Sequence, residues 1–264
     1  MTELARRLGG PELARRLGGP ELARRLGGPL TVQVAPVVLA APATEAVALE
    51  HAVVVQATFE LAGLGREPVL PAGLAPTVPT LLTFLSVHVP DGPLGRLALA
   101  QARLSCRSGV RARALVVASE VEGTSSAVEQ LAEGWGLGGR AGAVRLDRRY
   151  DRVTVEVPAW GLALGVADPS PIGAGDVQYV ASLHPVTTRD GESRLAQVEL
   201  DVVLERAERG RPELVTYDGL LVGSRRLQPA LPVAATVAAG TFTLPPIRYL
   251  LDPELPPHLG TTVL

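Results

Sequence analysis

From Thr31 onward the chain consists of short runs rich in valine, leucine and alanine that alternate with turn signals, and this pattern constrains the fold most. Valine and isoleucine favour extended backbone, and the 28 glycines and 23 prolines allow many chain reversals. Pro90-Asp91-Gly92-Pro93 predicts a hairpin turn, and Asp168–Gly175 is predicted to be a loop. Strands are expected at Thr31–Leu39, Ala52–Leu61, Thr80–Val89, Leu94–Cys106, Arg111–Glu120, Ala143–Leu146, Arg152–Pro158, Gln178–Leu183, Arg194–Arg206, Glu213–Leu221 and Ala234–Leu244, with a short segment at Ile247–Leu251.

One segment departs from this strand-and-turn pattern, and its residues predict a helix at Ser125–Trp135. Ser125 or Ser126 can cap its first turn, and Gly134 and Gly136 mark its end. A single helix set among many antiparallel strands is typical of an α+β fold. We therefore expect mostly antiparallel β structure that forms a curved sheet or barrel with one central helix.

The first residues form an internal repeat, because ELARRLGGP occurs at Glu3–Pro11, Glu12–Pro20 and Glu21–Pro29. Each copy has the Pro-Glu start and the Gly-Gly stop of a short helix, but a single copy is too short to be stable alone. Two interpretations are open. The repeats are either a docking segment or a recently duplicated, partly ordered tail, and the unusual period favours the tail. The chain is thus divided into the repeat segment 1–29 and one domain at 30–264.

Charge and cysteine content exclude several classes of function. A net charge of −2 gives no overall attraction to nucleic acid or to an anionic membrane, so neither is expected as a partner. The single cysteine, Cys106, excludes an internal disulfide and a thiolate metal cluster within one chain. No apolar run is long enough to span a membrane, and the start does not resemble a signal peptide, so we expect a cytoplasmic protein.

The chain contains no lysine, since all 25 of its basic residues are arginine. A Schiff base requires a primary amine, and the guanidinium group of arginine stays protonated and does not form an imine. The strong use of Arg, Ala, Gly and Pro is typical of a GC-rich genome. Whatever its origin, this bias leaves the side chains unable to form a covalent imine with a carbonyl substrate.

Several segments in order resemble the acetoacetate decarboxylase superfamily. The family has a helix that ends in a run like Arg-Glu-x-Trp-Gly-Phe-Pro-Lys-Lys, and the run Ala132-Glu133-Gly134-Trp135-Gly136-Leu137-Gly138-Gly139-Arg140 matches its Glu, Trp and Gly positions. The resemblance extends through LLTFLSVHVPDGPLG at Leu81–Gly95, QVELDVV at Gln197–Val203, and the TFTLPPIRYLLD ending. It covers roughly Ala52 to Asp252, and it implies a barrel around a mostly apolar cavity and a homo-oligomer.

The sequence departs from the family pattern where the family does its chemistry. In the family, the first lysine of the Pro-Lys-Lys run condenses with a β-keto acid, and the second lowers its pKa by like-charge repulsion. Here Gly138 replaces the proline, Gly139 the nucleophile and Arg140 the neighbouring lysine. The acidic pocket residue of the family hairpin is also absent, and Leu99 and Gln101 lie in that segment instead. Schiff-base decarboxylation is therefore not expected.

Two residues remain as catalytic candidates. Arg140 could hold a carbonyl, enolate or carboxylate oxygen, or it could be a surface residue paired with Glu133. Glu120 could act as an acid or base if burial raises its pKa, or it could lie at a solvated strand end. No second polar partner for Arg140 is evident from the spacing of the sequence. This favours catalysis that holds a reactive substrate conformer over catalysis that stabilises charge on a substrate oxygen.

Further candidates could bind a substrate. Trp135 could wall an apolar pocket, although packing is the more ordinary role for it. Gln101 and Arg103 alternate with alanines on a predicted strand, so they line either the barrel interior or, as the pattern slightly favours, the solvent. No metal site or cofactor is expected, because no metal-ligand, phosphate-loop or dinucleotide motif is present. The predicted substrate-binding set is Trp135, Gln101, Arg103, Leu99, Gly139 and Leu137.

These features favour a cofactor-independent enzyme of specialised metabolism that acts on a small hydrophobic, polyketide-type carbonyl compound. A cyclase or isomerase, including a pericyclic one, fits a site that works by shape and a few polar groups. One alternative is a non-catalytic protein that binds an apolar ligand or serves as a scaffold. Another is a lysine-independent decarboxylase or dehydratase.

Overall fold

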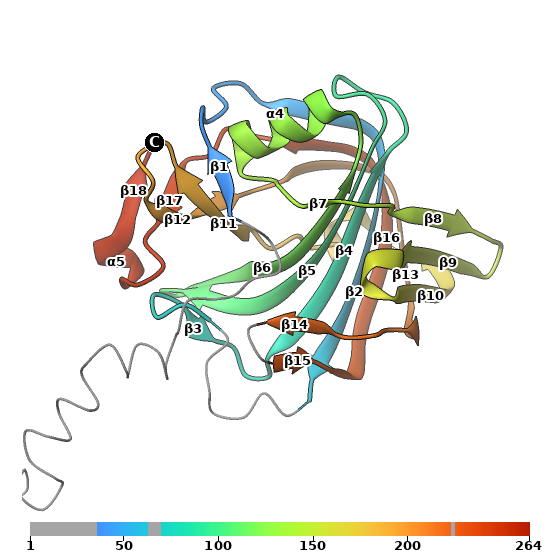
Figure 1. The fold of residues 1–264 in the computed structure, drawn as a ribbon. Helices are drawn as coiled ribbons and strands as arrows, with labels where there is room; N and C mark the ends of the chain where they lie inside the picture. Colours follow the sequence, from blue (N-terminus) through green and yellow to red (C-terminus); the bar gives the residue numbers. More distant parts are fainter. Residues whose placement is uncertain (1–35, 63–69, 223–224) are drawn as a thin grey trace, which may run out of the picture.

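The computed structural model describes residues 36–62, 70–222 and 225–264 (Figure 1). The predicted repeat segment 1–29 and most of the predicted strand Thr31–Leu39 lie outside the described residues. Within the described part the chain is mostly strand, as the sequence pattern predicts. Its strands are β1 Val37–Leu39, β2 Val47–Leu61, β3 Ala75–Pro76, β4 Leu81–Val89, β5 Leu97–Ser108, β6 Arg111–Glu122, β7 Arg140–Ala141, β8 Arg145–Arg148, β9 Arg152–Val157, β10 Leu162–Pro171, β11 Ser182–Thr188, β12 Ser193–Val198, β13 Asp201–Thr216, β14 Leu220–Val222, β15 Arg225–Leu227, β16 Pro229–Leu244, β17 Tyr249–Leu251 and β18 Thr261–Val263.

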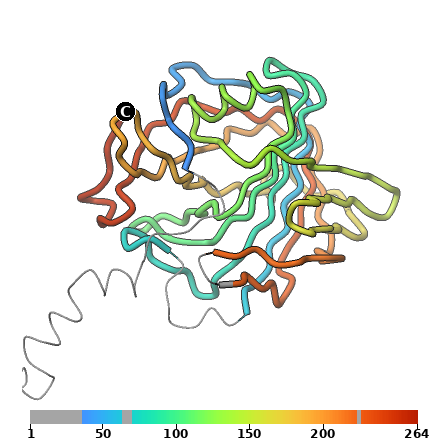
Figure 2. Tube along the Cα trace, in the orientation of Figure 1, coloured from blue at the N-terminus to red at the C-terminus, as the bar shows by residue number. Residues whose placement is uncertain are grey.

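Most of these strands join one long sheet, whose order is β18-β17-β12-β11-β6-β5-β4-β2-β16-β13-β10-β9-β8. Its pairings are antiparallel, apart from the parallel pairs β1·β11, β6·β11 and β6·β7. The predicted hairpin around Pro90 is confirmed by the antiparallel pairing of β4 with β5. In the described part of the chain the sheet curves strongly without closing into a barrel, since its end strands β18 and β8 do not pair (Figures 1 and 2).

The central helix α4 has the predicted bounds, Ser125–Trp135, and lies over the upper part of the curved sheet (Figure 1). Its N-cap is Thr124 instead of the predicted Ser125 or Ser126, because the Thr124 side chain accepts a hydrogen bond from the Ala127 N–H. Gly136 ends the helix in the left-handed conformation, with a φ of 64°. A one-turn helix α5, Pro257–Gly260, and two short 3-10 turns, Pro158–Trp160 and Ala174–Asp176, complete the described helical residues.

Several predicted bounds in the second half of the chain are wrong. Strand β10 includes Asp168–Pro171, which was expected to be a loop, and its first half was not predicted. The predicted strand Gln178–Leu183 begins only at Ser182, and Arg194–Arg206 is two strands, β12 and β13. The turn signals Asp168 and Pro169 appear as an irregularity within β10, because the register with β13 shifts between Ala167 and Ser170 and Asp168 has a φ of 50°.

The two faces of the central strands bury two separate hydrophobic cores. On β5, Ala98 and Ala100 belong to a core that also contains β9 and β10, whereas Leu97 and Leu99 belong to a core beneath α4. Alternate residues of a strand point to opposite faces, so β5 is apolar on both sides. We call the core that contains Leu97, Leu99, Leu131 and Trp135 the helix-side core, and its face of the sheet the helix-side face.

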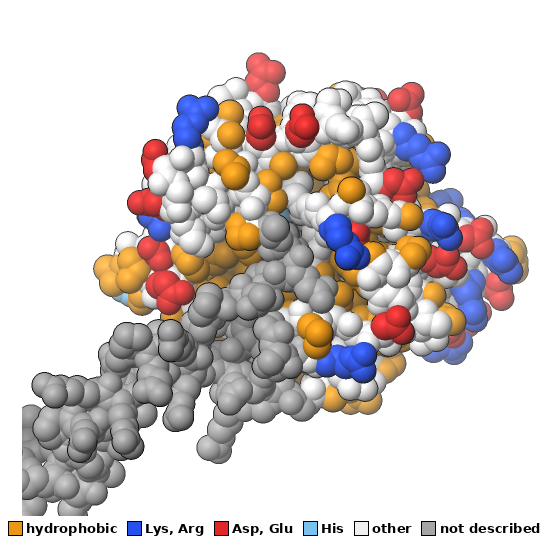
Figure 3. All heavy atoms as spheres, viewed as in Figure 1, with side chains coloured by type: hydrophobic (Ala, Val, Ile, Leu, Met, Phe, Trp, Pro, Cys, Tyr) orange, Lys and Arg blue, Asp and Glu red, His pale blue; other side chains and the backbone are white. Residues whose placement is uncertain are grey.

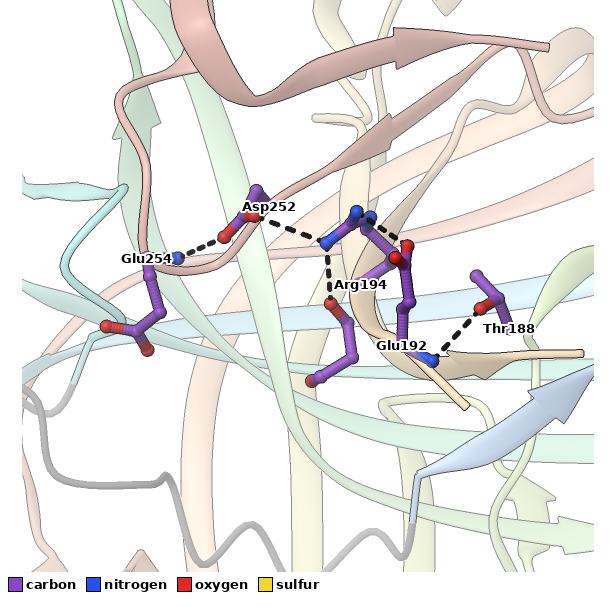
Figure 4. A network of polar contacts seen from close by, with 6 residues as sticks. Thr188, Glu192, Arg194, Asp252 and Glu254 are labelled. Carbon is purple, nitrogen blue, oxygen red and sulfur yellow. Dashed lines mark hydrogen bonds and ion pairs between the residues drawn. The ribbon is translucent and has the colours of Figure 1, made fainter. Parts of the chain in front are cut away.

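The end of the chain is fastened to the sheet by an arginine network (Figure 4). Arg194 on β12 donates to Asp252 at 3.2 Å, just beyond β17, and to Glu192 at 2.7 Å. Asp252 also accepts from the Glu254 N–H at 2.8 Å, and the Glu192 N–H donates to the Thr188 hydroxyl at 3.2 Å. These bonds hold the β11–β12 turn and the segment after β17 together, so we assign the network a structural role.

The surface has no charge of one dominant sign on the face shown in Figure 3, where acidic and arginine side chains are interspersed around apolar ones. This mixture agrees with the net charge of −2. No helix among the described residues is long and apolar enough to cross a membrane.

Candidate functional site

A small cavity of about 30 Å³ lies between α4 and the helix-side face of the sheet. Its walls are mainly aliphatic, with Leu99 from β5, Leu131 from α4, Leu137 after α4 and Phe242 from β16. The polar groups in the wall are Arg103 and Ser182. A cavity of this size holds about one water molecule, which is far less than a substrate-sized pocket of roughly 300 Å³ or more. Ligand entry therefore requires part of the wall to move.

Arg103 is the unusual member of this wall, because its residue is only 6% exposed. Its guanidinium donates through Nε, at 2.9 Å, and through Nη2 to the amide oxygen of Gln101. Burial lowers the pKa of Arg103 to about 10, an effect that Tyr179 partly offsets, so the group stays charged at neutral pH. Among the described residues no carboxylate pairs with it. A buried cation without a counter-ion is costly and favours binding of an anionic or strongly polar oxygen.

Further polar side chains share the helix-side core with Arg103. The hydroxyl of Ser182 and Nε2 of His184 lie 2.8 Å apart on β11, and Leu183 between them points into the opposite core. Burial, with a smaller effect of Arg103, lowers the pKa of His184 to about 3, so the imidazole is neutral at neutral pH. Three buried atoms of this region lack a hydrogen-bond partner in the described structure: Nε2 of Gln101, Oγ of Ser119 and Oη of Tyr179. Such unpaired groups are rare in protein cores and need an explanation.

In the loop after α4, position 139, where the resemblance places the family nucleophile, has no space for a side chain. A Cβ added to Gly139 would lie 2.8 Å from the backbone carbon and oxygen of Ser119 on β6. A Cβ added to Gly138 would lie 1.8 Å from Cγ2 of Val37 on β1. The loop therefore packs directly onto β6 and β1, and no lysine-sized side chain could occupy position 139 without moving backbone.

Arg140 and Glu120 form a different cluster on the other face of the sheet. Arg140 Nε donates to Glu120 Oε1 at 3.0 Å, and the indole N–H of Trp160 donates to the same oxygen at 3.2 Å. Glu120 pairs with Ala100 on β5, whereas Gln101 pairs with Ser119, so the Glu120 and Gln101 side chains point to opposite faces. The Glu120 side chain is buried and that of Arg140 is 62% exposed. Burial raises the pKa of Glu120, and Arg140 opposes this effect.

The structure brings together only part of the predicted site. The cavity is lined by Leu99, Leu137 and Arg103, whereas Gln101 does not line it but accepts a hydrogen bond from Arg103. The interpretation that Gln101 and Arg103 face solvent is wrong, because both are buried. Trp135 is buried and donates to the carbonyl of Pro245 at 2.8 Å, which is a packing role.

The remaining sequence candidates do not line the cavity. Arg140 has a carboxylate partner, contrary to the expectation from its spacing, but this partner is Glu120 and not Glu133. Gly139 packs on Ser119. A catalytic role for Arg140 and Glu120 stays a prediction.

Sequence reasoning did not find Tyr179, Ser182, His184 or Ser119. The alternation Ser182-Leu183-His184 in a strand was a usable signal for the pair on β11, because it places both polar side chains on one face. No group of three or more His, Cys, Asp or Glu residues that could hold a metal ion occurs in the described ranges. The larger hollows are open surface grooves, one of about 660 Å³ beside His88 and one of about 620 Å³ beside Arg148.

Comparisons with known proteins place the fold. The chain matches acetoacetate decarboxylase from Legionella pneumophila with a TM-score of 0.62 and 16% identity, over 78% of this chain and 87% of that one. It matches the enduracididine biosynthesis enzyme MppR, in complex with pyruvate, with a TM-score of 0.58 and 18% identity, over 77% and 89% of the two chains. It matches an acetoacetate decarboxylase-like enzyme from Sphingomonas wittichii with a TM-score of 0.55 and 15% identity, over 78% of this chain and 92% of that one. No family model and no curated protein sequence matches the chain.

These matches define the chain as a protein with the acetoacetate decarboxylase-like fold, which confirms the fold predicted from the sequence. At such low identity the likeness extends to the fold, and activity has to be argued from the site. The site has no lysine and places a buried arginine beneath the helix.

Proposed function

We propose that this chain is a cofactor-independent enzyme that cyclises or isomerises a small hydrophobic, polyketide-type carbonyl compound without a Schiff base. The observation that carries the proposal is Arg103, a buried cation without a carboxylate partner in the described structure, set in an aliphatic wall. A substrate oxygen that bears or develops negative charge would supply the missing partner of this guanidinium. The aliphatic wall would bury the rest of the molecule and fix its conformation.

The groups around the cavity favour some chemistries over others. A guanidinium donates hydrogen bonds to an oxygen that gains charge in a transition state, and removing one such donor costs on the order of 10²–10³ in kcat. The neutral His184, with its pKa near 3, is a weak base at neutral pH, and Tyr179 holds its proton strongly because burial raises its pKa. Reactions that need a strong base are thus less well supported than rearrangements within one molecule, including pericyclic ones.

The pyruvate complex of MppR supports the proposal, because it shows that a protein of this fold binds a small carbonyl acid. In the present chain no side-chain amine could form an imine with such a compound, and Arg103 is the cation available to it in the cavity. The proposed site therefore recognises a carbonyl compound by charge, hydrogen bonds and shape.

Binding of simple probes tests the site before a substrate is known. Hexanoate, hexanol and hexylamine share a chain length and differ in charge, so calorimetry should show binding of hexanoate and none of hexylamine. Arg103→Met should abolish hexanoate binding. Arg113→Met is the matched control, because Arg113 also donates to a glutamine, Gln197 at 3.0 Å, but lies on the part-exposed end of β6. Equal binding of the three probes, or unchanged hexanoate binding in Arg103→Met, would contradict the proposal.

Catalysis itself is tested by metabolite profiling of a deletion strain, complemented with wild type or with Arg103→Met. An uncyclised or unisomerised precursor should accumulate in the deletion strain and persist with Arg103→Met. A non-catalytic binding protein is the second candidate, and the small, mainly aliphatic cavity favours it. That candidate predicts hexanoate binding without any accumulated precursor.

A further inference from the structure

The segment Ile172–Ala181, which we call the Tyr179 strap, links strands from opposite sides of the sheet. It leaves β10 at one side and reaches β11 near the other, with six strands between them in the sheet order (Figure 1). Apart from the 3-10 turn Ala174–Asp176 it has no regular structure. Most of its residues are exposed, including Gln178 and Val180 on either side of Tyr179.

Few hydrogen bonds hold this strap to the rest of the described chain. The Ile172 N–H donates to the Ala207 carbonyl at 2.9 Å at one end, and the Ala181 carbonyl accepts from the Ala114 N–H at 3.1 Å at the other. Between these anchors, the exposed Arg209 side chain donates to the Asp176 carbonyl at 3.2 Å. Segments with exposed backbone and few bonds open at low free-energy cost, so the strap is poorly fixed between its ends.

Tyr179 is the residue by which this exposed segment enters the helix-side core. Its ring packs edge-to-face on Phe242, with centroids 5.5 Å apart, and Phe242 lines the cavity. The Tyr179 hydroxyl is buried without a hydrogen-bond partner in the described structure. The Arg103 guanidinium is near enough to oppose the rise in the pKa of Tyr179 that burial causes. The phenol therefore lies beside the cation and one wall of the cavity.

We infer that Tyr179 is a displaceable plug, which occupies the mouth of the Arg103 cavity and swings out on the strap when an anionic apolar ligand enters. The inference rests on the proposed function and adds the residue that controls access to its site. Tyr179 itself does not line the closed cavity, but its ring packs on Phe242, which does.

The closed position is stabilised by the ring and opposed by the hydroxyl. The aromatic ring gains apolar burial against Phe242. The buried hydroxyl, however, forgoes the hydrogen bonds that it would make with water, and such an unpaired group is costly. A ligand with an apolar body and an anionic oxygen replaces the ring contacts, pairs with Arg103 and lets the phenol return to solvent. A neutral ligand would also replace the ring contacts and release the phenol, but it would not gain the pairing with Arg103.

Fluorine NMR on wild-type protein tests this directly. The chain has four tyrosines, which 3-fluorotyrosine labels, and Tyr179→Phe assigns the signal of Tyr179. Saturating hexanoate should move this signal to the position of an exposed tyrosine and leave the other three unchanged. Tyr179→Ala should bind hexanoate about tenfold more tightly, because the cost of opening is removed. Gln178→Ala, an exposed neighbour on the same strap, should bind as wild type does.

The outcomes separate this inference from the proposed function. If hexanoate binds in an Arg103-dependent way while the Tyr179 signal stays in place, the plug is refuted and the proposed site stands. If neither wild type nor Tyr179→Ala binds hexanoate, both fail. If Tyr179→Ala does not fold, the fluorine measurement on wild type still decides, since it needs no substitution at the plug.

Discussion

Replacing the buried Arg103–Gln101 pair by apolar residues should make the protein more stable while it abolishes ligand binding. The double variant Gln101→Leu/Arg103→Met keeps side-chain volume and removes both polar partners. Burial lowers the pKa of Arg103 from 12.5 to about 10, which corresponds to about 3 kcal/mol of unfavourable free energy for the charged form in the folded protein. The residue is 6% exposed, so little solvent screening reduces this figure.

The sign follows from the direction of the shift. The charged guanidinium is less favourable in the folded state than in the unfolded chain at every pH below about 10, so the penalty is present throughout the neutral range. Removing Arg103 alone would leave the Gln101 oxygen without its charged donor, at a cost of about 1–3 kcal/mol, which is why both residues are replaced. The double variant should therefore gain about 3 kcal/mol in free energy of unfolding.

Urea denaturation followed by circular dichroism measures the gain, together with a rise in melting temperature of roughly 6 °C or more. The control Gln197→Leu/Arg113→Met removes a similar but part-buried pair and should not gain stability, because Gln197 also donates to Glu199. If the Gln101→Leu/Arg103→Met variant is instead less stable than wild type, Arg103 is a satisfied structural residue and the argument for an anion site fails.

Four further predictions test other parts of the structure. Borohydride with pyruvate should trap no covalent adduct within Ala52–Asp252, and a modified peptide there by mass spectrometry would overturn the exclusion of Schiff-base chemistry. Leu99→Trp should fill the cavity, abolish hexanoate binding in calorimetry and cost about 1–3 kcal/mol of stability in urea; retained binding would place the site elsewhere. Arg140→Ala should lower stability by about 1–3 kcal/mol, because Glu120 loses a charged donor, and leave hexanoate binding unchanged; weaker binding would implicate Arg140 in the site. The pKa of His184 falls from 6.5 to about 3 on folding, so the unfolded chain binds the extra proton and the free energy of unfolding should drop as the pH falls from 6.5 toward 3. In urea titrations, His184→Gln should reduce the slope of this dependence by about 1.4 kcal/mol per pH unit. An unchanged slope would mean that His184 is not buried in its neutral form.

The fold was predictable because its main signals are local. The helix Ser125–Trp135 begins after a residue that caps it and ends at Gly136, which adopts the left-handed conformation, so its bounds follow from sequence. The β4–β5 hairpin follows from its proline and glycine turn. Strand β10 could not be found in the same way, because its pairing with β13 depends on residues far away along the chain. The turn preference of Asp168 and Pro169 is accommodated as a bulge, and the strand resumes at Ser170, which pairs with Arg209 of β13.

The site was less predictable, for two physical reasons. The alternation along β5 assigns its residues to two faces of the strand but does not show which face contacts solvent. Here both faces are buried, so Arg103 lies in a core although its pattern also fits a strand with one solvated face. Tyr179 lies in an irregular segment whose neighbours are exposed, and only tertiary packing on Phe242 shows that it enters the core. The sequence placed Leu99, Gln101, Arg103 and Leu137 in one site without showing that Arg140 and Glu120 face the other way.

The absence of lysine and the presence of a buried arginine can be understood together. In a Schiff-base site, a covalent bond holds the substrate and a neighbouring cation adjusts the amine, so the nucleophile needs space beside the helix end. Here that space is occupied, because Gly139 lies directly against Ser119. Ser119 on β6 is paired with Gln101 on β5, and Gln101 accepts hydrogen bonds from Arg103, so the buried cation lies on the strand next to β6. A substrate held at the proposed site would meet a permanent charge in an apolar wall. Recognition would then depend on the charge and shape of the whole molecule, and not on a carbonyl carbon open to attack.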